Sequence, residues 1–437
     1  MPIIINNINI NSISGPVSFH FLEPNILKFR EFKKYGVHIP MIILFGDYHL
    51  SGEECDNCYC VDNECCFPVY SEDFLKLLDS LSSPTKPIDI SVETFPDDET
   101  RRGISLDLLK FNIENTSMDK IIYRFKNCFI KEFRFDESCP TKNIKWHYID
   151  ARRQQRFDNK YNYEQLMTYL LDLNLVTYSE GIVLDNLLTN PKLQIININV
   201  IFNILKYFDY DFTFLVKFIE SYAYLLEGNI EKFAEFHFSD TNRIFVKRSL
   251  IYKQIYKQKI PDFKSLKYWR DIFVKSVSNY IRMNLFNIKM NDNIIKMFSK
   301  VILPYLYDII DNIKKGTYNF MSNNDIKKLA DNIGINNEQF QANLEILKDY
   351  MTTTNASLLD IYYITRMLKV PEGSINPYLS VAYLGYAHTY NISYLLNEVM
   401  NLYKPVYNIK SRKNTHKCLN IPKNVILDLN LFFDKYS

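Results

Sequence analysis

Short apolar runs alternate with helical patterns over the first 150 residues. Residues 41–45 read Met-Ile-Ile-Leu-Phe, an unbroken apolar run that stops at Gly46 and is typical of a strand buried on both faces. Ser71 has the side chain of an N-cap. The further predicted strands are residues 88–95 and 144–149, and the predicted helices are residues 71–81 and 104–126. Strands that alternate with helices predict a parallel sheet covered by helices.

Two extended pieces precede this pattern, at residues 3–5 and 17–21, and predict a β-hairpin or an arm. After about residue 160, strand patterns nearly disappear. Apolar residues then recur at helical spacing in six stretches: residues 164–178, 200–226, 263–286, 293–313, 324–333 and 338–350. A helix at 357–369, a strand ending at Gly385, a helix at 392–402 and a basic tail at 404–417 complete the chain.

We therefore predict an α/β protein with a largely parallel central sheet and flanking helices, interrupted by a large all-helical insertion. The predicted core comprises residues 1–160, with a cysteine-rich loop at 52–66, and residues 351–437, which include the C-terminal tail. Residues 161–350 form the predicted insertion or cap.

Composition narrows the choice of partners. The 437 residues are 47% hydrophobic and carry a net charge of +2, so no overall basic field indicates a nucleic-acid partner. No segment approaches the roughly 20 apolar residues that span a bilayer. The N-terminus lacks the basic flank and apolar core of a signal peptide. We expect a soluble protein without a membrane span or classical secretion.

Two strands end in the same short motif. Gly46-Asp-Tyr-His49 follows the run at 41–45, and Gly385-Tyr-Ala-His388 follows the apolar run that begins at Leu379. If the strands are parallel, both histidines lie at one edge of the sheet with Glu93 and Arg152. Two histidines and a carboxylate can ligate a divalent metal that keeps an open water position. Alternatively, one histidine acts as a general base beside a carboxylate, and Arg152 binds negative charge.

Ordinary structural roles compete with each of these assignments. A histidine after a strand is often a polar loop residue, and Glu93 can form a structural salt bridge with Arg152. Asp360, Tyr363 and Arg366 recur every three residues and can share one helix face. For Asp360 and Arg366 we predict an ordinary helical ion pair. Structural roles are expected for the other histidines: His20, His38, His147, His237 and His416.

The cysteines raise a separate question, because five of the eight fall between Cys55 and Cys66. Cys55-x-x-Cys58 has the spacing of a zinc knuckle, but Cys65-Cys66 does not supply a second C-x-x-C. Cys55 and Cys58 are therefore candidates for zinc ligands or for disulfides, and a reduced buried cluster is the third option.

The chain resembles the TIKI/TraB superfamily, which includes ChaN-like and erythromycin-esterase-like proteins. The resemblance rests on Gly46-Asp-Tyr-His49, Ser91-Val-Glu93, Asp150-Ala-Arg152 and Gly385-Tyr-Ala-His388. It implies a polar cleft at the sheet edge, built around His49, Glu93 and His388 with Arg152 beside them. Gly46, Tyr48 and Gly385 would line the cofactor site. Asp47 stands where the family often has Glu.

The superfamily includes metal-dependent peptidases, ester-cleaving enzymes and a haem-binding lipoprotein. The run from Asp360 to Leu368 also looks like segments of uncharacterised proteins of large DNA viruses. The resemblance thus implies a metal-assisted hydrolase of a peptide, ester or amide bond, using Mn, Co, Fe or Zn. The alternative is a non-catalytic viral structural or host-interaction protein, with a protein partner or a place in the virion. Haem binding is a third option, and host cytoplasm or virion is the expected location.

Overall fold

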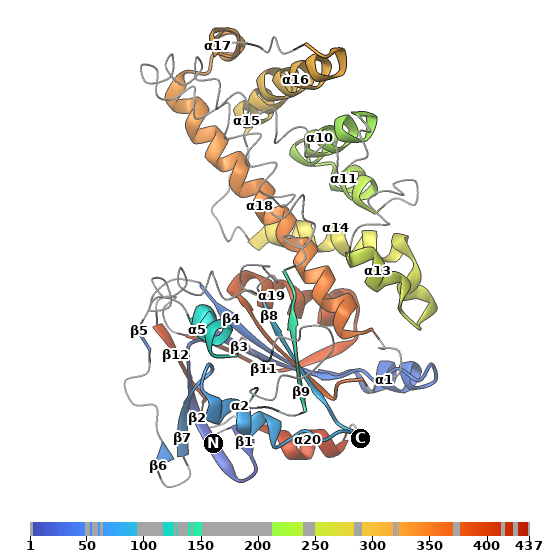
Figure 1. Ribbon diagram of the computed structural model, residues 1–437, viewed down its shortest axis with the longest axis vertical. Coiled ribbons are helices and arrows are strands. Elements are labelled where there is room, and N and C mark those ends of the chain that lie inside the picture. Colours follow the sequence, from blue (N-terminus) through green and yellow to red (C-terminus); the bar gives the residue numbers. More distant parts are fainter. Residues whose placement is uncertain are drawn as a thin grey trace. The chain divides into compact units, whose positions relative to one another are not determined.

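The chain divides into two compact units. The computed structural model describes residues 3–48, 53–54, 60–61, 64–93, 117–125, 128, 139, 141, 143–150, 212–238, 250–283, 291–317, 321, 323–369, 376–411, 416–422 and 427–435. The α/β unit comprises Met1–Ala151, Lys253–Ser265 and Leu359–Ser437, and the helical unit comprises Arg152–Tyr252 and Leu266–Leu358. One helix, α18 (Asn337–Met367), has residues in both units (Figure 1).

In the described part of the α/β unit, the main sheet has six strands in the order β11-β3-β4-β10-β8-β9. They are β3 (Ser18–Pro24), β4 (Met41–Asp47), β8 (Ile88–Val92), β9 (Ile144–Tyr148), β10 (Leu379–Gly385) and β11 (Tyr403–Lys410). β4, β10, β8 and β9 run parallel, whereas β3 and β11 join the β4 side as antiparallel strands. The predicted fold class, a largely parallel α/β sheet with flanking helices and a helical insertion, is confirmed.

Burial explains why β4 and β10 occupy the centre of this sheet. Every residue of both strands is buried, as expected for parallel strands covered on both faces. Two expectations at the antiparallel side differ from the structure. Residues 17–21 belong largely to β3 inside the sheet, and the predicted basic tail contains β11. β11 pairs with β3 over its length, so its charged side chains lie on an edge strand.

A second sheet gathers short segments from both ends of the chain, and its described part has seven strands. They are β1 (Ile3–Ile5), β2 (Ile8–Ser14), β5 (Glu53–Glu54), β6 (Cys60–Val61), β7 (Glu64–Pro68), β12 (His416–Asn420) and β13 (Leu427–Asp428). β1 and β2 form a hairpin whose turn residues Asn6 and Asn7 have φ values of 49° and 65°. The sequence predicts a hairpin or an arm from residues 3–5 and 17–21, but residues 3–5 pair with β2 instead. β2 also pairs with β7 and β12, which ties the two ends of the chain together.

Helices flank the sheets of the α/β unit. They are α1 (Ile26–Lys33), α2 (Glu72–Asp79), α5 (Ser117–Arg124), α19 (Tyr386–Tyr394) and α20 (Leu429–Lys435), with a π-helical turn at Leu395–Val399 and a 3-10 turn at Pro261–Lys264. Ser71 caps α2 as predicted, because its side chain accepts a hydrogen bond of 3.1 Å from the Phe74 amide. α19 begins directly after Gly385 rather than at residue 392, so His388 lies in the first turn of a helix.

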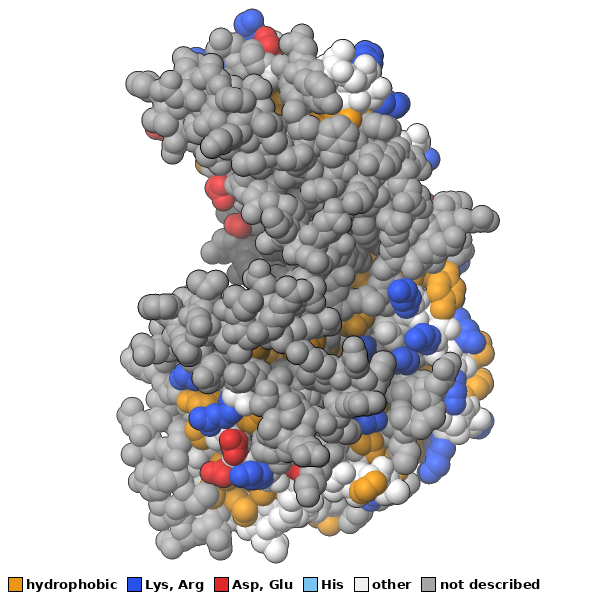
Figure 2. Space-filling view, in the orientation of Figure 1, with side chains coloured by type: hydrophobic (Ala, Val, Ile, Leu, Met, Phe, Trp, Pro, Cys, Tyr) orange, Lys and Arg blue, Asp and Glu red, His pale blue; other side chains and the backbone are white. Residues whose placement is uncertain are grey.

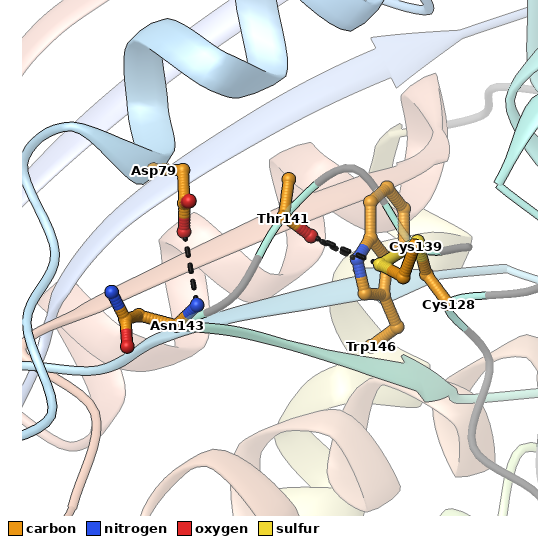
Figure 3. Close-up of a disulfide and its surroundings, with 6 residues drawn as sticks. All are labelled: Asp79, Cys128, Cys139, Thr141, Asn143 and Trp146. Carbon is orange, nitrogen blue, oxygen red and sulfur yellow. Dashed lines mark hydrogen bonds between the residues drawn. A yellow bond between two sulfur atoms is a disulfide. The ribbon is translucent and has the colours of Figure 1, made fainter. Parts of the chain in front are cut away.

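A disulfide between Cys128 and Cys139 joins the segment after α5 to the segment that enters β9 (Figure 3). Thr141 contacts both the disulfide and strand β9. Its hydroxyl accepts a hydrogen bond of 3.3 Å from the Trp146 indole and lies 3.3 Å from the Cys139 sulfur. Cys65 and Cys418 also take part in disulfides. Cys55 and Cys58 lie outside the described residues, so their role stays a prediction.

The helical unit contains α10 (Phe212–Leu226), α11 (Ile230–His237), α14 (Leu266–Met283), α15 (Asp292–Met297), α16 (Leu303–Lys315) and α17 (Asn323–Asn332), a π-helical turn at Phe298–Ile302, and the first part of α18. α13 (Leu250–Tyr256) crosses a boundary between the units. The core of this unit is aromatic and includes the fully buried Tyr222 and Trp269. The predicted helix at 164–178 lies outside the described residues.

α18 corrects one prediction, because residues 338–350 and 357–369 form a single helix rather than two. The intervening Thr-Thr-Thr-Asn has low intrinsic helix propensity. Local and tertiary bonds compensate: the Thr354 hydroxyl donates to the Tyr350 carbonyl at 2.8 Å, and Asn355 accepts from the Tyr222 hydroxyl at 3.2 Å. The helix therefore continues through a stretch that the sequence pattern alone marks as a break.

The surface combines both charge signs with apolar groups. On the face seen in Figure 2, the described basic and acidic side chains lie among hydrophobic ones, in line with the net charge of +2.

Among the described helices, a segment both long enough and apolar enough to cross a membrane is not found.

Candidate functional site

The carboxyl ends of three neighbouring strands bring the candidate residues together. In the parallel register of β4 and β10, Asp47 lies opposite Gly385. On the other side of β10, Val92 lies opposite Tyr383, and the Glu93 amide donates a hydrogen bond of 3.1 Å to the Tyr383 carbonyl. Asp47, Gly385 and Glu93 therefore lie at one edge of the sheet, as the sequence predicts.

His388 stands at the centre of a buried hydrogen-bonded chain at this edge. Its Nδ1 lies 2.6 Å from Oδ1 of Asp360, and its Nε2 lies 3.3 Å from Oε1 of Glu93. Because ionised carboxylates only accept hydrogen bonds, both ring nitrogens carry protons in this arrangement. The side chain of Asp360 is fully buried, and those of His388 and Glu93 are 8% and 10% exposed.

Backbone and amide donors fix the two carboxylates. The Gly385 amide donates to Oε2 of Glu93 at 2.6 Å, and the Asn391 side chain donates to Oδ2 of Asp360 at 2.5 Å. We call Glu93, His388, Asp360 and Asn391 the His388 chain. Its members come from the end of β8, from α19 and from α18, so tertiary structure assembles it from segments far apart in the sequence.

Electrostatics decide the protonation state of His388. Burial by itself lowers the pKa of the imidazole, but the charges of Glu93 and Asp360 and their hydrogen bonds raise it, and the result is a pKa of about 10. His388 is thus an imidazolium between two carboxylates at neutral pH. This state balances charge in a place where an unpaired ion would be costly.

The predicted site residues meet only in part within the described chain. Glu93, Gly385 and His388 come together as predicted. His49 and Arg152 lie outside the described residues, and their roles stay predictions. Asp360 is the member that our sequence analysis missed, and the predicted ion pair between Asp360 and Arg366 is wrong. Asp360 bonds His388, whereas Arg366 bonds His147.

Arg366 of α18, six residues after Asp360, takes part in a second, half-buried network with residues of β8 and β9. Arg366 donates to Nδ1 of His147 at 2.8 Å, and Nε2 of His147 lies 2.9 Å from Oδ2 of Asp89. Tyr363, between them in sequence, lies 3.1 Å from the Ser380 hydroxyl on β10. The three-residue spacing of Asp360, Tyr363 and Arg366 therefore does mark one face of α18, which contacts α19 through Asp360 and the sheet through the other two residues. We call Asp89, His147 and Arg366 the His147 chain.

The first motif is held by packing and by a buried ion pair. A Cβ added to Gly46 would lie 2.8 Å from the Thr389 hydroxyl and 3.1 Å from Cα of Tyr386, so helix α19 requires glycine here. The absence of a side chain at Gly46 thus makes room for the chain's own helix. Oδ1 of Asp47 lies 2.9 Å from Nζ of Lys417 in β12, and both side chains are at most 2% exposed.

The described His, Cys, Asp and Glu side chains limit where a metal could bind. Among the described residues, His388 and Glu93 approach one another, but no group of three or more His, Cys, Asp or Glu side chains forms a cation site. A metal at this edge would need a donor beyond the described pair.

Comparisons with protein-family models, with curated proteins and with solved structures find no match for this chain. Its assignment to the superfamily named above remains a prediction from the paired motifs.

Proposed function

We propose that the chain is a hydrolase of a peptide, ester or amide bond, with the His388 chain at the centre of its site. One observation carries the proposal: Glu93, His388 and Asp360 form a buried chain where parallel strands end. That edge is where open α/β sheets bind their ligands. A carboxylate that holds one ring nitrogen of a histidine is a common device for orienting the other.

The donors that are present fit a divalent metal such as Mn, Co, Fe or Zn. Asp360 keeps Nδ1 of His388 protonated, which leaves Nε2 as the coordinating atom once its proton is released. Nε2 and Oε1 of Glu93 are 3.3 Å apart. Two donors that share a tetrahedral ion at about 2.0–2.1 Å lie roughly 3.3 Å apart, so this spacing suits joint ligation. His49 is the proposed further donor, and a bound ion would supply an activated water.

The chain's own groups have distinct tasks in this proposal. Gly385 holds Oε2 of Glu93 through its amide, which directs Oε1 toward His388. Asn391 holds Asp360, and Asp360 holds His388. Arg152, by its predicted position after the third strand, stabilises the negative charge that develops on the substrate.

Metal content, measured by elemental mass spectrometry, tests the proposal. Wild type is compared with His49→Ala/His388→Ala and with His147→Ala, which removes a half-buried histidine of the same unit that lies outside the site. We expect one Mn, Co, Fe or Zn per chain in wild type and His147→Ala, and none in the double variant. A chain without metal, or one that loses metal equally in both variants, contradicts metal-assisted chemistry at this site.

One observation favours a second candidate, the non-catalytic structural or interaction protein. Both ring nitrogens of His388 already bond to carboxylates, and a closed, charge-balanced chain of this kind also suits a purely structural role. In that case the double variant loses stability but no metal. Hydrolysis of a panel of peptides and esters by wild type, lost in Glu93→Gln, would decide against it.

A further inference from the structure

A stacked pair of tyrosines joins the two Gly-x-x-His motifs. Tyr48 belongs to the first motif and Tyr386 to the second, and their ring centroids lie 5.0 Å apart with an interplanar angle of 18°. The pair follows directly on the last matched residues of the two strands, Asp47 and Gly385. Beyond that point the two backbones part, because the chain after Gly385 enters α19.

Close backbone contact makes this stack possible. The first turn of α19 lies against Gly46, where an added Cβ would be 3.1 Å from Cα of Tyr386 and 2.2 Å from the Ser18 hydroxyl. Ser18 in turn lies 3.4 Å from the Thr389 hydroxyl. Backbone contacts therefore place α19 against β4 independently of the aromatic rings, and they give the ring of Tyr386 a defined position.

Further contacts hold Tyr386 from other elements. The Lys410 ammonium of β11 lies 4.6 Å from its ring centroid, and the Tyr390 ring lies 4.9 Å away. His20 of β3 meets Tyr390 edge-on at 4.9 Å. Tyr386 is buried, whereas Tyr48 is only half-buried. These contacts hold the ring of Tyr386, and Tyr48 stacks on it.

We propose that Tyr386 is a positioning residue that holds the first motif against the second through Tyr48. Tyr48 directly precedes His49 in the sequence, so the stack sets where the chain leaves β4. This inference rests on the proposed function for its purpose, since joint use of both motifs requires them to keep a fixed relation. Its physical content, a ring contact that orders the start of the first motif, is independent of the reaction.

The test compares Tyr386→Leu, which removes the ring, with Tyr386→Phe, which keeps it and removes the hydroxyl. Hydrogen–deuterium exchange of peptides that cover residues 46–52 reports on the first motif, and calorimetric titration with Zn²⁺ reports on the site. We expect Tyr386→Leu to speed exchange in these peptides and to weaken Zn²⁺ binding about tenfold, the upper range for an aromatic pair. Tyr386→Phe keeps the stacked ring and loses only the hydrogen bond with Tyr390, so it should match wild type in both measurements.

A matched control separates positioning from general stability. Phe125 and Trp146 stack in the same unit with the same geometry, 5.0 Å and 18°, away from either motif. Phe125→Leu should lower stability and leave the exchange of residues 46–52 and the affinity for Zn²⁺ unchanged. Equal effects of Phe125→Leu and Tyr386→Leu would overturn the inference, as would unchanged exchange in Tyr386→Leu or a loss in Tyr386→Phe.

A double variant adds a check on the pair itself. If Tyr386 acts through Tyr48, Tyr48→Leu should reproduce the faster exchange, and Tyr48→Leu/Tyr386→Leu should be no worse than either single change. Additive effects would show that the two rings act separately and would contradict the inference. A wild-type chain that binds no Zn²⁺ argues against the proposed metal site, and the exchange results still decide whether the stack positions the motif.

Discussion

Two histidines of the α/β unit, the buried His388 and the half-buried His147, differ in what faces their second ring nitrogen. His388 lies between the carboxylates of Glu93 and Asp360, and His147 lies between the carboxylate of Asp89 and the guanidinium of Arg366. The first has a pKa of about 10. For the second, burial lowers the pKa, Asp89 raises it and Arg366 lowers it, with a net downward shift.

The comparison teaches that burial alone does not fix the charge of a histidine. Both contacts that distinguish the two sites come from one helix, because Asp360 and Arg366 both belong to α18. An acid at one position yields a cation, and a base six residues later yields a neutral ring that accepts a hydrogen bond. Both nitrogens are bonded in each ring, so the two sites differ in the charge of the histidine and not in the number of its contacts.

The largest expected effect is the pH dependence of stability in metal-free protein. The pKa of His388 rises from 6.5 in the unfolded chain to about 10 in the folded one. Its stabilisation is therefore fully present below pH 6.5 and is lost as the pH rises toward 10, with an upper limit of about 5 kcal/mol. Urea unfolding of wild type and His388→Gln at pH 6 to 10 measures the loss. The two curves should converge at high pH, and a constant gap would contradict the assigned charge.

Asp360→Asn should reduce the difference between the two histidines by lowering the pKa of His388. The change removes a fully buried charge partner of His388 and keeps the side-chain volume, so we expect a loss of about 3 kcal/mol in the free energy of unfolding at pH 7. The pKa of His388, followed by its ring-proton NMR signal, should fall. A signal for His147 that stays unchanged serves as the internal control. An unaltered pKa of His388 would show that Glu93 alone sustains it.

Arg366→Met should make His147 more like His388 by raising its pKa. It removes the hydrogen bond of 2.8 Å to His147 and the positive charge that lowers the pKa of that ring. We expect the pKa of His147 to rise and the free energy of unfolding to fall by about 1 kcal/mol. NMR titration of both histidines checks the result. A downward shift at His147, or an equal shift at His388, would count against independent networks.

The sequence predicts the centre of the main sheet well, for a physical reason. Strands β4 and β10 are buried on both faces and therefore appear as almost continuous apolar runs, broken in β10 only by Ser380. Most of the second sheet escapes prediction: the sequence indicates only β1, and β5, β6 and β13 have two residues each, too few for a period to appear. α18 is interpreted as two helices since Thr-rich segments are poor local helix formers.

The candidate site is predictable where strand ends carry it and not where a helix completes it. Glu93 and His388 are found from their positions after apolar runs. Asp360 belongs to a helix, and an acid near a base on one helix resembles an ordinary surface ion pair. Its full burial, which changes that interpretation, depends on packing against α19 residues that only the folded chain supplies. An acidic residue on a mostly apolar stretch, as in Leu-Leu-Asp360-Ile-Tyr, is the signal that was available.

The disulfides have a consequence for how this molecule must be prepared. Cys65, Cys128, Cys139 and Cys418 are bonded in the folded chain, and such bonds persist in oxidising surroundings. In a reducing cytosol the same sulfurs become thiols, which bind Zn²⁺ and Cu⁺ as soft thiolate ligands. Metal counted on reduced material would then report the cysteines. If the protein is recovered from an oxidising secretory host without added thiols, its metal content reports on the two histidine motifs and not on these cysteines.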